Sequence, residues 1–388
     1  MVRPYDLVLF GATGFTGGLT AEYLAGHAPP GLRWALAGRN AAKLAAVRDR
    51  LESAPDVLHA DATDARSVRE VAESTRVVAS TVGPYVKFGE PLVAACAESG
   101  THYTDLTGEP RFVDEMYLRH HDTAVGSGAK LVHACGFDSI PADLGAYFTV
   151  QHLPEGVPLQ VESFYRVAGQ ASAGTVHSLI GAVADALPAR RAHRERRRRE
   201  GTPDGRRIGF TGPLPRTHPL GPWTVPLPTL DPQIVARSAA ALDRYGPEFR
   251  YGQYAVMPSP AAAAAAVVGA GAVAAAAQIR PVRNGILRRF PSGSGPTPEQ
   301  REAGWMSVRC TGVGGGQGVL TEVYSDRDPG YASTAIMLGE ATLSLALDDL
   351  PPAAGQLTTA VAMGDALIAR LDAAGITFRV LGRRTLPS

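Results

Sequence analysis

The sequence predicts an α/β protein, with a doubly wound parallel sheet in its first part and a second α+β lobe after it. Three features of the 388 residues lead to this prediction. Apolar runs alternate with amphipathic helical stretches up to about residue 140, and a glycine-rich turn joins the first run to the first helix. From about residue 160 the pattern changes to alternating strands, long polar helices and proline-rich connections. We therefore expect one domain over residues 1–140 and a second over 141–388, whose C-terminal helices pack back on the first.

The first strand and the turn after it form the most informative segment. Tyr5 to Phe10 is an apolar run, and Gly11, Gly14 and Gly17 follow it before the helix-forming Leu19 to Leu24. In Rossmann-type domains these glycines make the tight turn, let backbone N–H groups approach a pyrophosphate, and let the helix pack close to the strand. The positive end of the helix then holds the phosphates. The predicted cofactor contacts in this turn are Gly11, Ala12, Thr13, Gly14, Phe15, Thr16 and Gly17.

The same alternation predicts the rest of the first domain. Strands are expected at Leu32–Gly38, Asp56–Asp61, Arg76–Gly83, His102–Leu106 and Lys130–Gly136, with helices at Asn40–Leu51, Asp64–Glu73 and Pro91–Ser99 and a polar helical run before the last strand. Six or seven units of this length make a complete doubly wound sheet. Because ligands of such sheets bind at the carboxyl ends of the strands, side chains at those ends are the candidate site residues.

The end of the second strand bears on the choice of nicotinamide cofactor. An acidic residue there would bond the adenosine ribose of NAD, but the sequence is AGRN, which places Arg39 after Gly38 and offers no carboxylate. A guanidinium can bind a 2′-phosphate through charge and forked donors, so NADP is predicted, with Lys43 adding a second charge. Asp61, followed by Ala62, would meet the adenine amino group. The alternatives are surface cations at a helix start for Arg39 and Lys43, and a helix-capping region for Asp61.

The fourth strand ends in STVGPY, which is expected to lie beside the nicotinamide. Gly83 and Pro84 make a small, rigid turn where the ring must approach backbone, and Tyr85 is expected to project its phenol at the edge. The predicted cofactor contacts at this end of the sheet are Thr81, Val82, Gly83, Pro84 and Gly136.

Hydride delivery leaves a developing negative charge on the substrate, so a proton donor or hydrogen-bond donor is needed nearby. HYTDLTGE is expected to bring His102, Tyr103, Asp105 and Glu109 to the same sheet edge, and Asp138, Ser139 and Asp143 cluster after the next strand. The candidate catalytic residues are Tyr85, His102, Tyr103 and Ser139. Structural alternatives exist, since a tyrosine can fill a core and Asp105 or Asp138 can cap a helix.

Composition excludes several classes of function. Lys plus Arg total 38 and Asp plus Glu total 37, so the net charge of +1 gives no general attraction to nucleic acid. Cys96, Cys135 and Cys310 lack the spacing of a metal site or a disulfide framework. A strand begins after four residues, which leaves no room for a secretion signal. A reduced, cytoplasmic protein without a metal is expected.

The second lobe contains one predicted strand and three unusual segments. Leu159–Val167 alternates like a half-buried antiparallel strand. Arg190–Arg199 holds seven arginines at the end of a helical run, and is interpreted as a solvated helix end rather than a phosphate-binding surface. Ala261–Ala277 contains only Ala, Val and Gly, and four arginines follow it up to Arg289, so either internal packing or peripheral membrane contact of 261–289 is expected. Phe290–Gly304 is a predicted loop in which Thr297 caps a helix start.

Several motifs together resemble a known family. GATGFTG, AGRN, TVGPY and CGFDSIPADLG resemble the saccharopine dehydrogenase-like reductases. GPTPEQREAGW, DPGYASTAIMLGEATLSLA and AMGDALIARLDAAGITF, in the second lobe, resemble the trans-acting enoyl reductase branch. The resemblance covers nearly the whole chain. The segment Arg190–Gly221 departs from it, being unusually rich in Arg, Pro and Gly.

The resemblance implies NADPH-dependent reduction of an α,β-unsaturated acyl thioester on a separate polyketide synthase, during lipid or polyketide assembly. The matching positions are Gly11, Gly14, Gly17 and Arg39 for NADP, with Gly83 and Pro84 beside the nicotinamide. It carries over no proton donor.

Two other functions remain open from the sequence. One is reduction of an imine, or oxidation of a secondary amine, on an amino-acid substrate, which would require arginines that grip free carboxylates. The other is a nucleotide-binding regulator or lipid-surface scaffold without turnover. An acyl enzyme predicts an apolar channel with one or two donors, whereas an amino-acid enzyme predicts paired arginines and a scaffold predicts an obstructed nicotinamide site.

Overall fold

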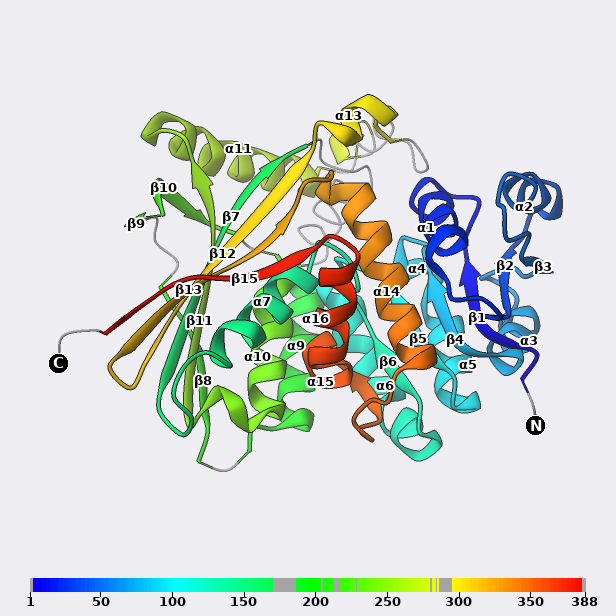
Figure 1. The fold of residues 1–388 in the computed structure, drawn as a ribbon, viewed down its shortest axis with the longest axis horizontal. Helices are drawn as coiled ribbons and strands as arrows, with labels where there is room; N and C mark the ends of the chain where they lie inside the picture. The colour runs from blue at the N-terminus through cyan, green and yellow to red at the C-terminus, as the bar shows by residue number, and fades with distance from the viewer. Residues whose placement is uncertain are drawn as a thin grey trace.

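The computed structural model describes residues 3–169, 186–203, 205–212, 216–218, 220–227, 229–279, 281–283, 285 and 295–385. Its two sheets lie on either side of a central layer of helices, with the first sheet and the N-terminus on the right of Figure 1. One hydrophobic core cluster joins residues of both sheets through helices that include α7 (Ile140–Val150) and α14 (Thr334–Leu347).

The first sheet confirms the predicted doubly wound architecture. Its seven strands lie in the order β14-β6-β5-β4-β1-β2-β3, and all neighbours are parallel. The strands are β1 (Tyr5–Phe10), β2 (Trp34–Gly38), β3 (Asp56–His59), β4 (Thr75–Ser80), β5 (His102–Asp105), β6 (Lys130–Val132) and β14 (Gly355–Leu357). The order reverses between β1 and β4, which is where dinucleotides bind in such sheets.

The helices of the first part are α1 (Phe15–His27), α2 (Ala41–Arg48), α3 (Ala65–Ser74), α4 (Tyr85–Phe88), α5 (Glu90–Ser99) and α6 (Pro110–Ser127). Their ends follow from local chemistry. Asn40 and Asp64 cap α2 and α3 by accepting from backbone N–H groups, at the helix starts that the sequence predicted. Gly100 and Gly128 end α5 and α6 in the left-handed conformation that glycine adopts without strain.

The end of the chain returns to the first sheet. α14 packs against β1, β4, β5 and α1, and almost every residue of it is buried. The close contact of α14 with α1 requires Gly339, where a Cβ atom would lie 2.6 Å from the Tyr23 ring. β14 then pairs with β6 and completes the sheet. The sequence did not predict this strand.

The second sheet has the order β15-β13-β12-β7-β11-β10-β9, and β8 also pairs with β11. Its strands are β7 (Leu159–Ala168), β8 (Arg207–Phe210), β9 (Arg216–His218), β10 (Gly221–Pro226), β11 (Glu248–Met257), β12 (Trp305–Gly314), β13 (Gln317–Ser325) and β15 (Thr377–Thr385). β7 is antiparallel to β12, as expected, but parallel to β11, so the sheet is mixed. α7 and α10 (Asp231–Ala241) pack on it, between the two sheets.

The remaining described helices are α9 (Ala186–Glu200), α11 (Pro260–Gln278), α13 (Pro298–Glu302), α15 (Thr359–Ala362) and α16 (Gly364–Ala373), with a π-helical turn at Pro329–Ser333 and a 3₁₀ turn at Asp243–Tyr245. Thr297 caps α13 through a capping box, at the predicted position.

The arginine-rich helix α9 lies against α6 and is more than a solvated end. Arg196 is buried and donates to the Asp114 carboxylate over 2.6 Å. Arg199 donates to the Leu118 carbonyl oxygen, whereas Arg197 and Arg198 are exposed. The run therefore divides into arginines that fasten α9 to α6 and arginines that face solvent.

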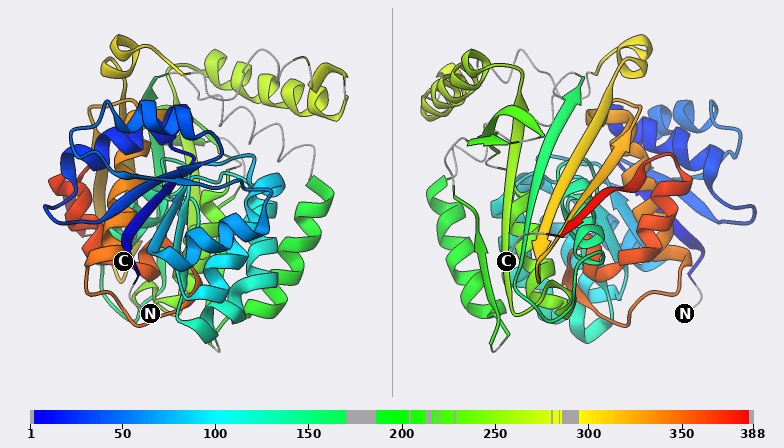
Figure 2. Two further views of the ribbon diagram at one scale, coloured as in Figure 1. Left: turned by 90° about the vertical axis from the view of Figure 1, so that its right-hand side faces the viewer. Right: turned by 60° about the vertical axis from the view of Figure 1, so that its left-hand side comes forward.

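α11 stands off the body of the protein, as both views of Figure 2 show. Among its residues only Ala263 and Ala277 are buried, so internal packing does not account for its apolar composition. Among the described residues it is the one helix long and apolar enough to cross a membrane, by length and composition alone. Arg280, Arg288 and Arg289 lie outside the described residues.

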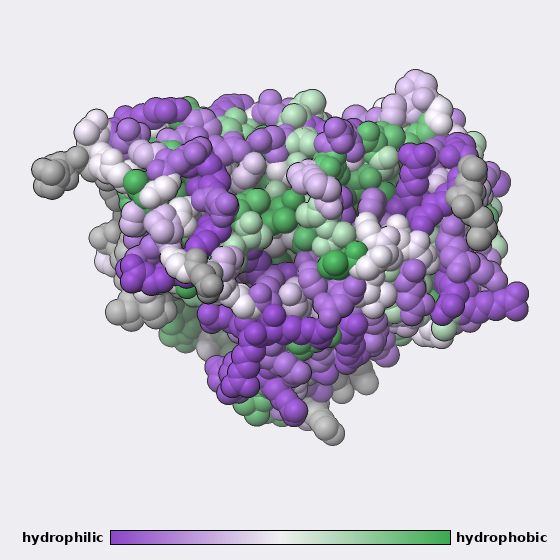
Figure 3. Space-filling model, turned by 90° about the horizontal axis from the view of Figure 1, so that it is seen from below, coloured by the Kyte–Doolittle hydropathy of each residue, from purple (hydrophilic) through white to green (hydrophobic). Residues whose placement is uncertain are grey.

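The face of the molecule seen from below is mostly hydrophilic, with apolar residues gathered near its centre (Figure 3).

Candidate functional site

The glycine turn after β1 forms a cradle that only glycine permits. Gly11 has φ +94°, and a Cβ atom on Gly17 would lie 2.3 Å from the Gly11 carbonyl oxygen. Gly14 caps α1 without a side-chain hydrogen bond, and the first turn of α1 carries no acidic residue. Thr13 and Gly14 are exposed. The first N–H groups of α1 therefore face an open surface, which is the arrangement that binds a diphosphate.

Residues of the second lobe contact Phe15, which begins α1 directly after the glycine turn. The Phe15 ring meets the Tyr331 ring edge to face at 4.8 Å between centroids, and the Arg301 guanidinium lies 5.5 Å from it. Gly295 approaches the same ring so closely that a Cβ atom would lie 2.3 Å away. Residues from two distant parts of the chain thus fix the edge of the cradle.

Cationic side chains lie at the end of β2, where the ribose would be bound. Arg39 and Lys43 are both exposed, and the cap from Asn40 to the Lys43 N–H fixes the start of α2 between them. His59 ends β3 opposite Gly38 and is also exposed, a neighbour that the sequence reasoning did not name. These positions fit a 2′-phosphate and offer no carboxylate to the ribose of NAD.

Asp61 takes part in a turn before α3. Its Oδ1 accepts hydrogen bonds from the Thr63 N–H and hydroxyl, which lower the pKa of the carboxyl, and the Arg39 charge lowers it further. Asp61 and Ala62 are both half-buried. This geometry favours the capping alternative for Asp61, and its contact with adenine stays a prediction.

The turn after β4 is exposed and well fixed. Thr81 donates its hydroxyl to the Gly11 carbonyl oxygen over 3.1 Å, so the two turns are tied together. Gly83 and Pro84 are joined by a cis peptide bond and both are exposed. Glu109 accepts from the N–H groups of Tyr85 and Val86 over 2.9 Å each, which anchors the turn from the β5 side. The backbone of Gly83 and Pro84 is therefore accessible at the position where the sequence predicts contact with the nicotinamide.

Tyr85 and Tyr103 do not fit the role of donor. Tyr85 is 6 % exposed; its hydroxyl donates to the Ser80 carbonyl oxygen over 3.0 Å and accepts from the Leu106 N–H. Tyr103 is fully buried in the core between β5 and the outer helices. Burial raises the pKa of both phenols well above the ordinary value. The Tyr85 hydroxyl connects the end of β4 to the residue after β5, and the Tyr103 ring packs in the hydrophobic core, so neither phenol is exposed at the turns.

His102 lies at the wrong end of its strand. It begins β5, whereas Asp105 ends it, so His102 is at the amino edge of the sheet, away from the cofactor turns. Its Nδ1 accepts from the Lys130 N–H over 3.0 Å. Burial, with the Lys130 charge, lowers the pKa of His102 to about 4. The sequence reasoning treated the whole segment as the end of a strand, and the direction of β5 corrects it.

Asp105 is also structural. Its Oδ1 accepts from the N–H groups of Thr107 and Ala134, and its Oδ2 lies 2.7 Å from His133 Nδ1. These contacts connect the carboxyl end of β5 to the residues that follow β6. Gly136 follows, and a Cβ atom there would lie 2.8 Å from Leu106 Cδ2, so its small size serves packing.

Ser139 points into a buried polar cluster between the two lobes. Its hydroxyl donates to Asp231 Oδ1 over 3.4 Å. Asp231 is 2 % exposed, and its Oδ2 accepts from Gln253 Nε2 and, over 3.5 Å, from the Tyr165 hydroxyl. The neighbouring Asp138 is half-buried, at the carboxyl edge of the first sheet. The cluster therefore joins the β6–α7 loop of the first sheet to α10, β7 and β11 of the second lobe.

Both carboxyls of the cluster are shifted toward the protonated form. Burial raises the pKa of Asp138 to about 6. Burial raises the pKa of Asp231 to about 7; repulsion from Asp138 adds to this, while the hydrogen bond from Gln253 opposes it. Asp231 was missed from the sequence because it lies 92 residues beyond Ser139 and because Asp231-Pro232 reads as an ordinary helix start.

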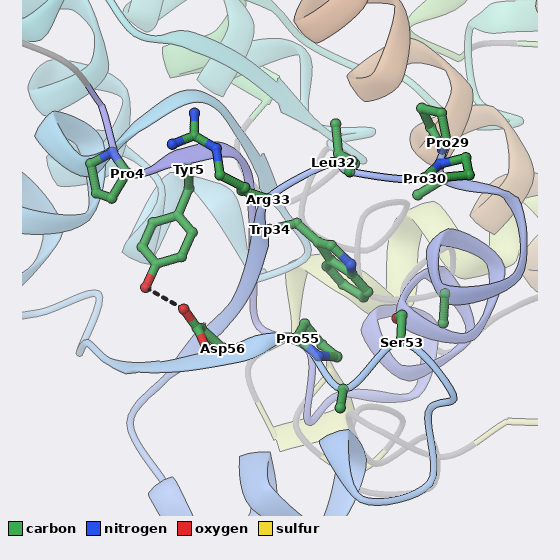
Figure 4. Close-up of a pocket in the computed structure, with 14 residues that line it drawn as sticks. Pro4, Tyr5, Pro29, Pro30, Leu32, Arg33, Trp34, Ser53, Pro55 and Asp56 are labelled. Carbon is green, nitrogen blue, oxygen red and sulfur yellow. Dashed lines mark hydrogen bonds between the residues drawn. The ribbon is translucent and has the colours of Figure 1, made fainter.

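A separate hollow of about 470 Å³ lies at the opposite edge of the first sheet. Pro4, Tyr5, Trp34, Pro55 and Asp56 are among its lining residues, and Tyr5 donates to Asp56 across it (Figure 4). These residues begin β1, β2 and β3, or directly precede them. The hollow is therefore away from the glycine turn and forms no part of the candidate site.

Comparison with known families identifies the cofactor. Residues 7–132 match the saccharopine dehydrogenase NADP binding domain, a span that runs from β1 through β6 and includes the glycine turn, Arg39 and the Gly83-Pro84 turn. The first part of the chain is thus an NADP-binding domain.

Relatives cover almost the entire length. A Mycobacterium tuberculosis protein, whose name places it among trans-acting enoyl reductases, is 39 % identical over 410 residues, with 97 % of each chain covered. A Mycobacterium ulcerans protein named trans-acting enoyl reductase is 36 % identical over 417 residues, which covers 96 % of this chain and 97 % of the relative. Among solved structures, saccharopine dehydrogenase (L-Glu forming) from Saccharomyces cerevisiae has the same fold, with a TM-score of 0.55, 14 % identity, and 98 % and 99 % of the two chains covered.

Proposed function

The chain belongs to the trans-acting enoyl reductase branch of the saccharopine dehydrogenase-like oxidoreductases, and from that premise we propose that it uses NADPH to reduce the C=C bond of an α,β-unsaturated acyl thioester. The observation that carries the proposal is the extent of the relationship. It includes the second lobe, from which Tyr331 and Arg301 contact Phe15 beside the glycine turn and Asp231 accepts a hydrogen bond from Ser139. A relationship limited to the NADP-binding domain would support a cofactor and no substrate.

The chain's own residues would hold the cofactor at three points. The N–H groups at the start of α1 bind the diphosphate, and Arg39 with Lys43 binds the 2′-phosphate. The exposed backbone of the Gly83-Pro84 turn lies beside the nicotinamide, which when bound supplies the hydride. Thr81 keeps the first and third points in register through its bond to Gly11.

The acyl group would lie between the β6–α7 loop and the second sheet. Val82, Leu106 and Phe137 follow β4, β5 and β6 and are half-buried, and the Phe137 and Tyr165 ring centroids are 6.0 Å apart. Apolar walls of this kind exclude water and strengthen electrostatic interactions with developing charge. A thioester carried by a separate polyketide synthase is the proposed physiological substrate.

The test is NADPH oxidation with a panel of thioesters. We expect turnover with crotonyl or longer enoyl thioesters, and none with the saturated thioesters of the same chain length. Turnover confined to imines of amino acids would replace this function with the amino-acid alternative. Tight NADPH binding without turnover of any compound would instead indicate a regulator or scaffold.

A further inference from the structure

We propose that a pocket on the second sheet binds a phosphate ester of the arm that carries the acyl thioester. Such an ester is common to coenzyme A and to the phosphopantetheine group of acyl carrier domains. The identity of the ligand rests on the proposed function, whereas the affinity of the pocket for phosphate esters does not. The pocket has a volume of about 400 Å³, and its lining includes Arg166, Trp305, Arg309, Glu322, Tyr324 and Arg379.

Strand register places these side chains on one face of the sheet. Ser307 of β12 pairs with Arg166 of β7 and with Tyr324 of β13, which gives one row across three strands. Because side chains alternate between the two faces of a sheet, residues directly opposite each other and residues two apart share a face. A second row, two residues away along β12 and β13, consists of Arg309, Glu322 and Arg379.

Helix α7 covers the opposite face. Cys310 and Val323 alternate with the lining residues along β12 and β13. A Cβ atom on Gly145 of α7 would lie 3.3 Å from Cys310 Sγ and 3.2 Å from Val323 Cγ2. Trp305 and Arg379, on the pocket side, are exposed. The pocket therefore opens to solvent on the side of the sheet away from α7.

The pocket has an excess of positive charge. Its lining contains three arginines and one carboxylate, that of Glu322. Glu322 Oε1 accepts from the Ser307 hydroxyl over 2.8 Å and from Arg309 Nε over 2.9 Å. The carboxylate is thus already engaged by one of the three arginines.

The other two arginines are available to an anion. Arg166 Nη2 donates to the Leu220 carbonyl oxygen over 2.8 Å, and the Arg379 guanidinium lies 5.9 Å from the centroid of the Tyr324 ring. Within the part of the chain that the structure describes, neither arginine forms an ion pair. Guanidinium groups bind phosphate oxygens through charge and paired donors. The Trp305 ring, which is 37 % exposed, adds an apolar surface for the rest of the arm.

The Trp305 end of the pocket adjoins the rim of the cofactor turn. Arg301, whose guanidinium contacts the Phe15 ring, precedes Trp305 by four residues, which span at most about 14 Å of extended chain. A phosphate held in the pocket would therefore anchor the arm on the part of the second lobe that is next to the cofactor.

The first test needs no turnover. Calorimetric titration of the NADPH-saturated protein measures the Kd for coenzyme A while NADPH keeps this probe out of the dinucleotide site. We expect coenzyme A to bind, and the double variant Arg166→Gln/Arg379→Gln to raise its Kd by about 10-fold or more. Absence of binding to the wild type, or an unchanged Kd in the double variant, would overturn the proposal.

Two fragments of coenzyme A distinguish the sources of the phosphate. Binding of 4′-phosphopantetheine would indicate the group that coenzyme A shares with acyl carrier domains. Binding of adenosine 3′,5′-bisphosphate alone would indicate a site for coenzyme A thioesters.

Two single variants are the controls. Arg250→Gln removes a cation from the same face of the sheet but outside the pocket, since Arg250 pairs with Gln160 of β7, and the Kd for coenzyme A should be unchanged. Glu322→Gln keeps an acceptor for Ser307 and Arg309 but removes the negative charge, so the Kd should fall. Weaker binding in both controls as well as in the double variant would show a structural effect and overturn the assignment.

The kinetic test separates the pocket from the reaction. With crotonyl coenzyme A, the double variant should raise KM by about 10-fold or more and leave kcat unchanged. The crotonyl thioester of N-acetylcysteamine has no phosphate, so its KM should be the same in both proteins. An equal rise in KM for the two substrates would contradict the proposal.

The two proposals fail in different ways. If the wild type turns over no enoyl thioester but binds coenzyme A through Arg166 and Arg379, the pocket stands and the reaction is wrong. If turnover occurs and the double variant keeps the wild-type KM for crotonyl coenzyme A, the pocket does not hold the substrate and the function stands.

Discussion

At the scale of single residues, the cofactor turn illustrates how much a local sequence can reveal. Gly11, Gly17 and Arg39 were predicted because their roles depend on backbone conformation and position relative to one strand. The donors could not be predicted in that way. Whether the Tyr85 ring is buried or exposed, and whether His102 begins or ends β5, depends on packing and strand limits that propensity does not fix.

Arg39 should discriminate between the two nicotinamide cofactors. Because its guanidinium would pair with the 2′-phosphate, Arg39→Ala should raise the Kd for NADPH by about 10- to 100-fold and leave that for NADH nearly unchanged. Titration followed by cofactor fluorescence measures both constants. Equal losses of affinity for the two cofactors would reject the assignment. The substitution keeps Asn40, which caps α2, so the start of that helix should be unchanged in the variant.

Gly17 should tolerate no side chain, in contrast to its neighbour. Gly17→Ala places a Cβ atom 2.3 Å from the Gly11 carbonyl oxygen and must push α1 away from the turn, so NADPH binding should be lost. Gly18→Ala is the control, since its nearest neighbour would be the Ala12 carbonyl oxygen at 3.8 Å, and alanine favours the helix. Retained binding in Gly17→Ala would show that the turn does not hold the diphosphate.

At the scale of elements, helix ends were predictable and helix environments were not. Asn40, Asp64 and Thr297 cap the helices that the sequence indicated, because a cap is a contact between residues two or three apart. The burial of Arg196 in α9 depends instead on Asp114 of α6, 82 positions away. A run of arginines therefore looks uniformly solvated until its partner helix is known.

α11 is the element with a testable surface role. Val268 is 71 % exposed on a helix without charged residues, so we predict that the protein sediments with anionic liposomes and that Val268→Asp reduces the bound fraction. The variant should melt at the wild-type temperature, because the side chain it replaces has few neighbours. A wild type that never sediments would leave α11 without a membrane role.

At the scale of the whole molecule, the sequence predicted the class of both lobes but not how the chain closes the first sheet. β14 has only three residues, Gly355–Leu357, and nothing in so short a run indicates that it pairs with β6. Its placement follows from the packing of α14 along the sheet. The division of the chain at residue 140 stays a prediction.

Residues 1–150 expressed alone should not form a stable domain. The fragment lacks β14 and the buried face of α14, so apolar surface of β4, β5 and α1 would be exposed to water. We expect a fragment without a cooperative thermal transition by circular dichroism, whereas the full chain shows one. A cooperative, NADPH-binding fragment would contradict this prediction.

The contact of Phe15 with Tyr331 and Arg301 has a kinetic consequence. A dinucleotide that enters or leaves along the glycine turn passes the Phe15 ring. Tyr331 and Arg301, which contact this ring, lie more than 280 positions later in the chain. Exchange of oxidised for reduced cofactor would then require a brief separation of the lobes, and the same separation would open the space for the acyl chain. Release of NADP⁺ is accordingly the step that we expect to limit the steady-state rate once the thioester is saturating.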